Sequence, residues 1–315
     1  MLGSRLPMPT DGPPHVTVGG HEARVVAASS RAITVVVPKE SDGGAQPVRV
    51  VEVPGETLVL DVATVVTTDV HQVDGPLCDR AGAVYVTHSG SRGTKAPVPM
   101  SRVNPDGTRD PLSVEIANPT SMALGPDNAI YVSSRFEGQV YRITTDGRAE
   151  LYATDLGVAT GLACAPDGRL FVGDRSGTIN CISVGQSGES PRHVEVYAEI
   201  PPSVAAFHLA FGPDGCLYVT APTLASQDVV YRVTPTREVQ VVCGSFGRPQ
   251  GLAFDHSGTL FVTDALAGAA GLYRVDVRAA TPTPELVIAA AHLVGVAFHP
   301  QGGMLLASSD TVWRL

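Results

Sequence analysis

The sequence predicts an all-β protein, and three observations carry this prediction. Six similar 15-residue segments follow one another along the chain, and their turn positions recur every 40 to 47 residues. Each segment holds a short apolar run, a turn of the Pro-Asp-Gly kind, and a second run in which apolar and polar residues alternate, which is the pattern of a β-hairpin. The composition agrees, because 33 glycines and 25 prolines in 315 residues suit many short strands joined by turns.

The six hairpin segments define a repeating unit. They read VDGPLCDRAGAVYVT, PTSMALGPDNAIYVS, ATGLACAPDGRLFVG, AFHLAFGPDGCLYVT, PQGLAFDHSGTLFVT and LVGVAFHPQGGMLLA, with the turn residues Gly82, Asn128, Gly168, Gly215, Gly258 and Gly302. Four of the hairpins are followed by a clear third strand, and several by a fourth such as EVQVVC. Four strands per unit at this period are typical of propeller blades. The sequence therefore predicts a six-bladed β-propeller.

The last repeat ends at its third strand, TVWRL, which would leave an unpaired edge. A strand-like run, LDVATVVTTDV at residues 60–70, lies directly before the first hairpin and belongs to no hairpin of its own. We expect this run to supply the missing fourth strand and to close the ring. The propeller then covers residues 56–315.

Residues 1–55 are predicted to form a separate strand-rich segment. Between residues 16 and 54 the patterns V-x-x-GG-x-x-A-x-V, I-x-V-x-VP and GG-x-x-P-V-x-V occur in order. This part resembles the C-terminal half of an IPT/TIG immunoglobulin-like domain, and the resemblance implies a partial domain that lacks its first strands. Because half a sandwich cannot bury its inner face alone, we expect it to pack on the propeller, to pair or self-associate with another chain, or to be the remainder of a domain that a longer chain completes.

Charge and hydropathy exclude several classes of partner. The formal net charge is −9, and the sequence has no cluster of lysines and arginines, so neither nucleic acid nor an anionic membrane surface is an expected partner. No stretch approaches the roughly 20 apolar residues of a membrane span, and the start, MLGSRLPMPTDGPP, lacks the apolar run of a signal peptide. As written, the chain is expected in the cytoplasm, whereas a longer native N-terminus would leave export open.

The repeats also supply a template against which single residues stand out. Small residues at the start of each central strand would let the six strands approach closely, but the fourth blade has His208 there. An imidazole at this place can act as a general base, a metal ligand or a hydrogen-bond donor, or it can pack between blades with its nitrogens satisfied by backbone groups. The six residues at this template position are Gly75, Ser121, Gly161, His208, Gly251 and Gly295.

Asp228 lies in an unusual loop, APTLASQD, that follows the second strand of the same repeat. Binding groups of propellers are often carried on longer loops of this kind. We expect Asp228 either to orient the ring of His208 or to cap its own turn.

From about residue 60 to its end, the chain resembles the gluconolactonase/regucalcin-like and NHL-repeat propellers. The resemblance implies lactonase activity and a divalent cation, Ca²⁺ first, at the channel mouth. It places the acidic ligand that precedes a Gly-Pro pair on Asp74, in Asp74-Gly75-Pro76, and makes Asp74 the one anionic metal ligand that is kept. The equivalent positions of the other blades are Thr120, Thr160, Phe207, Gln250 and Val294.

The same topology would place the residues that follow each second strand around the face that holds Asp74. Such a polar rim suits a small, oxygen-rich ligand, although each of these residues alone could be a solvated loop residue. The rim residues are His88, Arg135, Asp174, Arg175, Thr223, Asp264 and Ser309, and Thr160 and Gln250 would add a hydroxyl and an amide at the channel.

These residues favour a hydrolase of the gluconolactonase-like class, acting on a lactone or a related ester with Asp74, His208 and Asp228 as catalytic residues. The alternative is a non-catalytic propeller scaffold for a sugar, a peptide or a protein, because one fold hosts many functions. A third interpretation is a lyase in which His208 removes a carbonyl-activated proton. An enzyme should gather His208, Asp74, Gln250 and Asp228 in one polar pocket, whereas a scaffold should disperse them.

Overall fold

The structure is a computed structural model, and it describes residues 6, 8–53, 55, 57–144, 147–183, 193–266 and 269–315. The chain divides into two compact units, one of Met1–Val65 with Trp313–Leu315 and one of Val66–Val312. Within the described ranges, all strands and helices that the structure contains are β-strands. This part of the chain contains no helix long and apolar enough to cross a bilayer. The predicted all-β fold class is confirmed.

The N-terminal unit holds a five-stranded antiparallel sheet in the order β3-β2-β1-β4-β5. Alternate residues of its strands point to one side, where Val16, Ile33 and Val48 lie in a small apolar core. The IPT/TIG resemblance of this unit stays a prediction. The strands are β1 (Val16–Val18), β2 (His21–Ala28), β3 (Ile33–Val36), β4 (Gly44–Val50) and β5 (Leu58–Val62).

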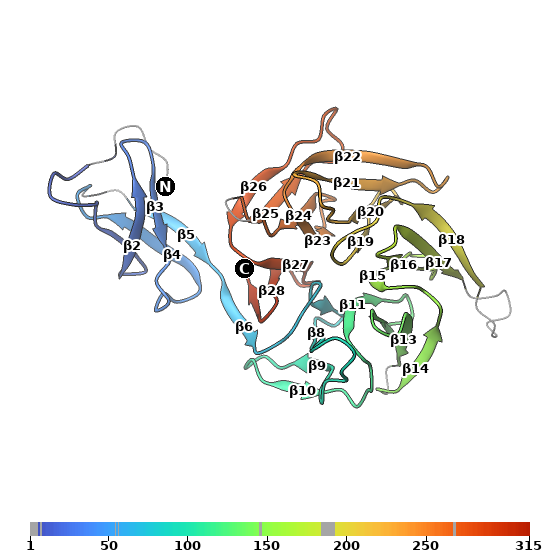
Figure 1. Cartoon of the computed structure of the whole chain (residues 1–315). Coiled ribbons are helices and arrows are strands. Elements are labelled where there is room, and N and C mark those ends of the chain that lie inside the picture. The colour runs from blue at the N-terminus through green and yellow to red at the C-terminus, as the bar shows by residue number, and fades with distance from the viewer. Residues whose placement is uncertain are drawn as a thin grey trace. The chain divides into compact units, whose positions relative to one another are not determined.

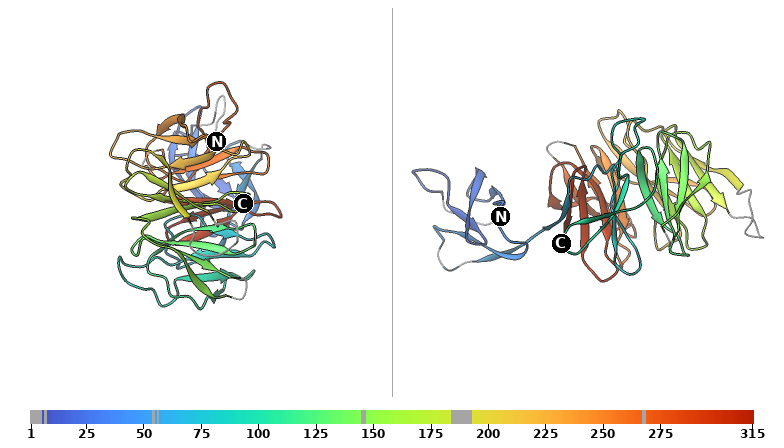
Figure 2. Two further views of the ribbon diagram at one scale, coloured as in Figure 1. Left: turned by 90° about the vertical axis from the view of Figure 1, so that its right-hand side faces the viewer. Right: turned by 90° about the horizontal axis from the view of Figure 1, so that it is seen from below.

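The second unit is a six-bladed β-propeller, whose four-stranded antiparallel sheets surround a central channel axis (Figures 1 and 2). In blades 1 to 5 the strands follow one another from the centre outward. Blade 1 is β7 (Leu77–Cys78), β8 (Val84–Thr87), β9 (Met100–Val103) and β10 (Arg109–Pro111); blade 2 is β11 (Pro119–Leu124), β12 (Ile130–Ser134), β13 (Gln139–Ile143) and β14 (Ala149–Ala153). Blade 3 is β15 (Ala159–Cys164), β16 (Leu170–Asp174), β17 (Thr178–Ser183) and β18 (His193–Glu199); blade 4 is β19 (His208–Phe211), β20 (Leu217–Thr220), β21 (Asp228–Val233) and β22 (Val239–Phe246). Blade 5 is β23 (Pro249–Phe254), β24 (Leu260–Asp264), β25 (Gly271–Val275) and β26 (Glu285–Ala289); blade 6 contains β27 (Leu293–Phe298), β28 (Met304–Ser308) and β29 (Thr311–Arg314).

The hairpin turns have the backbone that their sequences require. Asn128 and the glycines at the five equivalent turns all have a positive φ, between 68° and 96°, which is costly for most side chains. The aspartate that precedes several of these turns caps them; Asp127, for example, accepts a hydrogen bond from the Ala129 N–H. The repeat period was therefore readable because each blade needs the same special turn.

The sixth sheet combines both ends of the propeller sequence. Its order is β27-β28-β29-β6, where β6 is Thr64–Thr68. Val66 packs against a cluster that includes Val70 and Val312, and the hydroxyl of Thr67 donates to the carbonyl of Gly107 in blade 1. The run expected at residues 60–70 is thus divided, because β5 belongs to the N-terminal sheet and β6 is the fourth strand of blade 6.

Glycines let the central strands of blades 1, 5 and 6 approach closely. A Cβ atom on Gly295 would lie 2.1 Å from the Cα of Gly75, and one on Gly251 would lie 2.6 Å from the Cα of Gly295. Neither distance leaves room for a methyl group, and both obstacles are backbone atoms. The small residues of the template are therefore set by packing around the axis.

Replacing Gly295 with alanine should lower the free energy of unfolding by about 1–3 kcal/mol, because the added methyl overpacks a site walled by backbone. Gly244→Ala is the matched control, since a Cβ there would meet the Val229 side chain at an ordinary 3.5 Å. Urea denaturation of both variants measures the difference. Equal stabilities would contradict the close packing of the central strands.

Candidate active site

A buried pair of ionisable side chains lies at one end of the channel. His208 is the first residue of β19, and its Nδ1 lies 2.8 Å from Oδ1 of Asp74. The two residues are 134 positions apart in the sequence and come from blades 4 and 1. The His208 side chain is 1% exposed, whereas that of Asp74 is 18% exposed, so Asp74 is the more exposed member of the pair.

Two further donors fix the carboxylate of Asp74. The Gly75 N–H donates to Oδ1 at 2.7 Å, and the Ser121 hydroxyl donates to Oδ2 at 2.6 Å. Ser121 is itself held in place, because its oxygen accepts a hydrogen bond from the Leu162 N–H at 3.1 Å. Side chains of blades 1, 2 and 4 therefore meet at a single carboxylate.

The template position explains why these residues meet. Ser121 and His208 are the two members of the template that carry a side chain beyond Cα, and both reach Asp74. Gly161 lies between them in blade order, and a Cβ on it would come within 2.6 Å of the Phe207 carbonyl oxygen. The glycine thus lets the strand that carries His208 come close to blade 3.

The charge state of the pair follows from its contacts. Burial by itself raises the pKa of Asp74, but the positive charge that His208 can carry, together with the hydrogen bonds from His208, Ser121 and Gly75, lowers this pKa below its usual value. Asp74 is therefore a carboxylate that accepts the proton on Nδ1 of His208, which leaves the lone pair of the neutral ring on Nε2. Nε2 is buried and has no hydrogen-bond partner among the described residues.

Of the two roles considered for Asp228, the structure shows the cap of its own turn and not the contact with His208. Its carboxylate accepts hydrogen bonds from the backbone N–H and the hydroxyl of Thr223, at 3.1 and 2.7 Å. It therefore closes its own loop, and Asp74 is the residue that orients His208. A local contact over five residues orders less chain than a contact across the channel would.

Asp174 and Asp264, expected on the rim as substrate-binding residues, are also engaged with backbone. Asp174 accepts from the Val158 N–H at 2.7 Å. Asp264 accepts from the N–H groups of Gly247 and Arg248 at 2.7 and 2.8 Å. Both carboxylates thus hold the loops that enter the blade.

Of the remaining predicted residues, two are buried between strands near the channel and two lie half-buried after the second strands. The hydroxyl of Thr160 donates to the Gly173 carbonyl and accepts from the Phe207 N–H, so it joins blades 3 and 4. Gln250 is buried, and its backbone carbonyl accepts a hydrogen bond from the Thr220 hydroxyl at 2.5 Å. His88 and Arg135, in contrast, are half-buried residues directly after the second strands of blades 1 and 2.

Two residues beside the site were not recognised from the sequence as functional candidates. Ser121 was grouped with the small residues, although it is the only member besides His208 that is not glycine. His71 lies three residues before Asp74, and its ring packs edge-on against that of His88 with centroids 5.7 Å apart. No repeat position marks His71, because it precedes the first hairpin.

The residues at the channel do not fit a calcium ion. Calcium takes six to eight oxygen ligands, with carboxylates among them, but both oxygens of Asp74 already accept hydrogen bonds. The hydroxyls of Thr120 and Thr160 donate to backbone carbonyls. Within the described ranges, no three His, Cys, Asp or Glu residues gather in a way that could hold a metal ion. The Ca²⁺ expectation therefore depends on the family resemblance alone.

Calorimetric titration of the wild-type protein with Ca²⁺ should give no heat of binding at the dyad, because a metal would have to break the hydrogen bonds to Asp74. Asp74→Ala is the comparison. Saturable binding that this substitution abolishes would contradict the geometric argument and support the family-type site.

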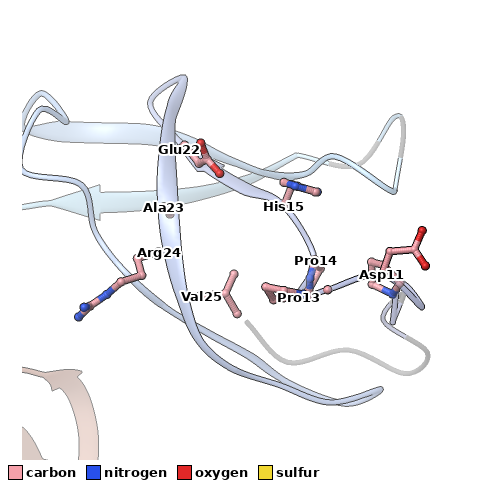
Figure 3. Close-up of a pocket in the computed structure, with 10 residues that line it drawn as sticks. Asp11, Pro13, Pro14, His15, Glu22, Ala23, Arg24 and Val25 are labelled. Carbon is pink, nitrogen blue, oxygen red and sulfur yellow. The ribbon is translucent and has the colours of Figure 1, made fainter.

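A separate pocket of about 670 Å³ lies in the N-terminal unit (Figure 3). Pro13, Pro14 and Val25 form its apolar part, and the charged side chains of Asp11 and Arg24 lie at its edges. It contains none of the residues singled out from the sequence, so we do not assign it a part in the site at the channel.

Comparisons with solved structures show that the fold is similar to that of several known proteins, which include a virginiamycin B lyase and a gluconolactonase. A protein of unknown function from Bacteroides thetaiotaomicron has a TM-score of 0.63 at 12% identity, over 93% of this chain and 87% of that chain. Virginiamycin B lyase from Staphylococcus aureus has a TM-score of 0.55 at 15% identity, over 92% of each chain. A gluconolactonase from Xanthomonas campestris has a TM-score of 0.51 at 15% identity, over 78% of this chain and 86% of that chain.

These similarities confirm the propeller resemblance that the repeats indicated. At such identities they establish the fold alone. No protein-family model and no curated protein matches this chain.

Proposed function

We propose that this protein is a hydrolase that opens a lactone or a related ester at the channel mouth, with His208 as general base and Asp74 as the residue that positions it. The observation that supports the proposal is the 2.8 Å hydrogen bond between Asp74 and Nδ1 of His208, which leaves Nε2 as an unpartnered base. A buried nitrogen without a partner costs about 1–3 kcal/mol, so a water or substrate atom placed there gains a hydrogen bond.

The reaction uses the dyad in the following way. Nε2 takes a proton from a water molecule while the water oxygen attacks the carbonyl carbon. The carbon–oxygen bond of the ester then breaks, and the imidazolium returns the proton to the departing alkoxide, which yields a carboxylic acid and an alcohol. Asp74 remains ionised and stabilises the positive charge on His208 during the step.

A lyase is the second candidate, because the same nitrogen can remove a proton from a carbon beside a carbonyl. The electrons of that carbon–hydrogen bond then form a carbon–carbon double bond as the leaving group departs. One solved neighbour is a catalytically inactive histidine-to-alanine variant of virginiamycin B lyase from Staphylococcus aureus with quinupristin, which has a TM-score of 0.56 at 16% identity over 93% of this chain and 92% of that chain. That neighbour motivates the candidate but carries no residue to this chain.

The test is a panel of simple lactones, chromogenic esters and a cyclic depsipeptide, with product masses measured. Hydrolysis gives a product heavier by one water, whereas elimination gives a product of unchanged total mass with a new double bond. Turnover with addition of water supports the hydrolase. No turnover of any substrate would leave the propeller as a non-catalytic binding scaffold.

A further inference from the structure

Three neighbouring blades carry cationic or imidazole side chains at equivalent positions. The position is the first residue after the second strand of each blade, and blades 4 to 6 place small residues there. In blade order the six residues are His88, Arg135, Arg175, Ala221, Ala265 and Ser309. At this position, three of the six blades therefore carry a basic side chain and three carry a small one.

These positions lie at the end of the propeller that holds the dyad. The backbone N–H groups of Arg135 and Arg175 donate to the carbonyls of Asn118 and Val158, at 3.4 and 3.3 Å. Asn118 and Val158 directly precede β11 and β15, and β11 carries Ser121 of the site. In blade 1, His88 contacts His71, which precedes Asp74 by three residues.

The arginines at this end have no carboxylate partner in the part of the chain that the structure describes. Arg135 makes no side-chain hydrogen bond or ion pair to any described residue, and neither does Arg92 in the loop after His88. Arg175 donates one hydrogen bond, to the Val204 carbonyl at 2.7 Å, and its buried Nε has no described partner. By contrast, Arg169 pairs with Asp167 at 2.8 Å at the other end of the same strand, β16.

The nearby acids are engaged elsewhere. Asp174 accepts from the Val158 N–H, and Glu137 accepts from the hydroxyls of Ser134 and Tyr141. Asp69 shares a pocket of about 330 Å³ with His88, but its carboxylate accepts a hydrogen bond from the Thr68 hydroxyl. Aspartate and glutamate outnumber lysine and arginine in the sequence by 31 to 22, so the absence of a described ion pair to these arginines is not a consequence of overall charge.

The basic groups act on one another instead. Burial lowers the pKa of Arg135, and the charges of Arg175 and Arg92 lower it further. Burial also lowers the pKa of His71, and His88 and Arg135 add to that effect. Like charges that have no carboxylate paired with them repel one another and attract an external anion.

We propose that a basic rim, defined as His71, His88, Arg92, Arg135 and Arg175, binds an anionic group of the substrate, either a carboxylate or a phosphate. Arginine presents planar paired donors that match both groups. The inference deepens the proposed function, on which it depends for the reacting ester at His208. Binding of the anion itself does not depend on catalysis.

The test titrates inorganic phosphate and glycolate separately into the full-length protein by calorimetry at low ionic strength. At least one probe should bind, and which of the two binds identifies the source of the anionic group. Arg135→Gln combined with Arg175→Gln should weaken binding at least tenfold, because two unpaired positive charges are lost. Arg169→Gln is the matched control, since it removes the same type of charge from the opposite end of β16 and should leave binding unchanged.

Two outcomes would overturn the proposal: neither probe binds the wild-type protein, or Arg169→Gln weakens binding as much as the double substitution does. If the double variant does not fold in a thermal melt, Arg135→Lys with Arg175→Lys replaces it and should keep most of the binding. His208→Gln should also keep it. Anion binding without ester turnover would refute the proposed function alone, and turnover of neutral esters without anion binding would refute the basic rim alone.

Discussion

Replacement of His208 with glutamine is expected to lower kcat for ester or lactone hydrolysis about 10²- to 10⁴-fold, the usual contribution of a positioned general base. Glutamine can still donate a hydrogen bond to Asp74, so the fold should persist while the basic nitrogen is lost. KM should change little, because the imidazole acts on the attacking water. Steady-state kinetics of the purified variant measure both constants.

The control for this substitution is His256→Gln. His256 lies in a hairpin turn of blade 5, where its ring meets the His299 carbonyl at 3.4 Å, at the opposite end of the blade from the dyad. Its kcat should equal that of the wild-type protein. An equal loss of activity in both variants, or full activity in His208→Gln, would refute the assignment of the base.

The contacts of Asp74 should also affect how the stability of the protein depends on pH. Because the pKa of Asp74 is lowered in the folded protein, its ionised form stabilises the fold above the ordinary aspartate pKa of about 3.9. This stabilisation is lost as the pH falls through the lower, folded-state pKa. Asp74→Asn should therefore reduce kcat as His208→Gln does. It should also weaken the loss of unfolding free energy at acidic pH, which urea denaturation measures. His256→Gln should leave that pH dependence unchanged.

Removal of residues 1–69 is expected to abolish the cooperative unfolding of the propeller. The deletion takes away β6, so β29 loses one of its two neighbours in the sheet and becomes an edge strand, and Val66 leaves its apolar cluster. Val66 is partly buried, so its loss costs less than the roughly 1.5–3 kcal/mol of a fully buried valine, and each buried polar group left unpaired costs about 1–3 kcal/mol more. The ring is also no longer closed by strands from the two ends of its sequence.

The matched control is removal of residues 1–62, which takes away β1 to β5 but keeps β6. This shorter deletion should retain a cooperative thermal transition and the near-ultraviolet circular dichroism of packed aromatic side chains. Size-exclusion chromatography would report aggregation of the longer deletion through its exposed edge. Identical melting of the two deletions would show that β6 does not close the ring.

Much of the fold could be read from the repeats, because every blade needs the same hairpin and the same turn with a positive φ. The template also marked His208, since an imidazole departs from the five other local copies of the pattern, which carry glycine or serine. Asp74 was marked by its place before Gly75-Pro76, both as a catalytic residue and as a metal ligand, and its hydrogen bonds do not favour the second of these roles. The partner of His208 could not be chosen from sequence, because Asp74 and Asp228 are both plausible carboxylates and only their positions in space differ.

The sequence by itself determined the all-β class, the number of blades and the one histidine at the channel, because these depend on local periodicity and on turn residues. Tertiary structure decided which groups act together. It placed Asp74 against His208 across the channel, assigned Asp228, Asp174 and Asp264 to backbone N–H groups, and left Arg135 and Arg175 without a described carboxylate. These outcomes depend on distances between blades that are separated by tens of residues, and a repeat pattern carries no information about such distances.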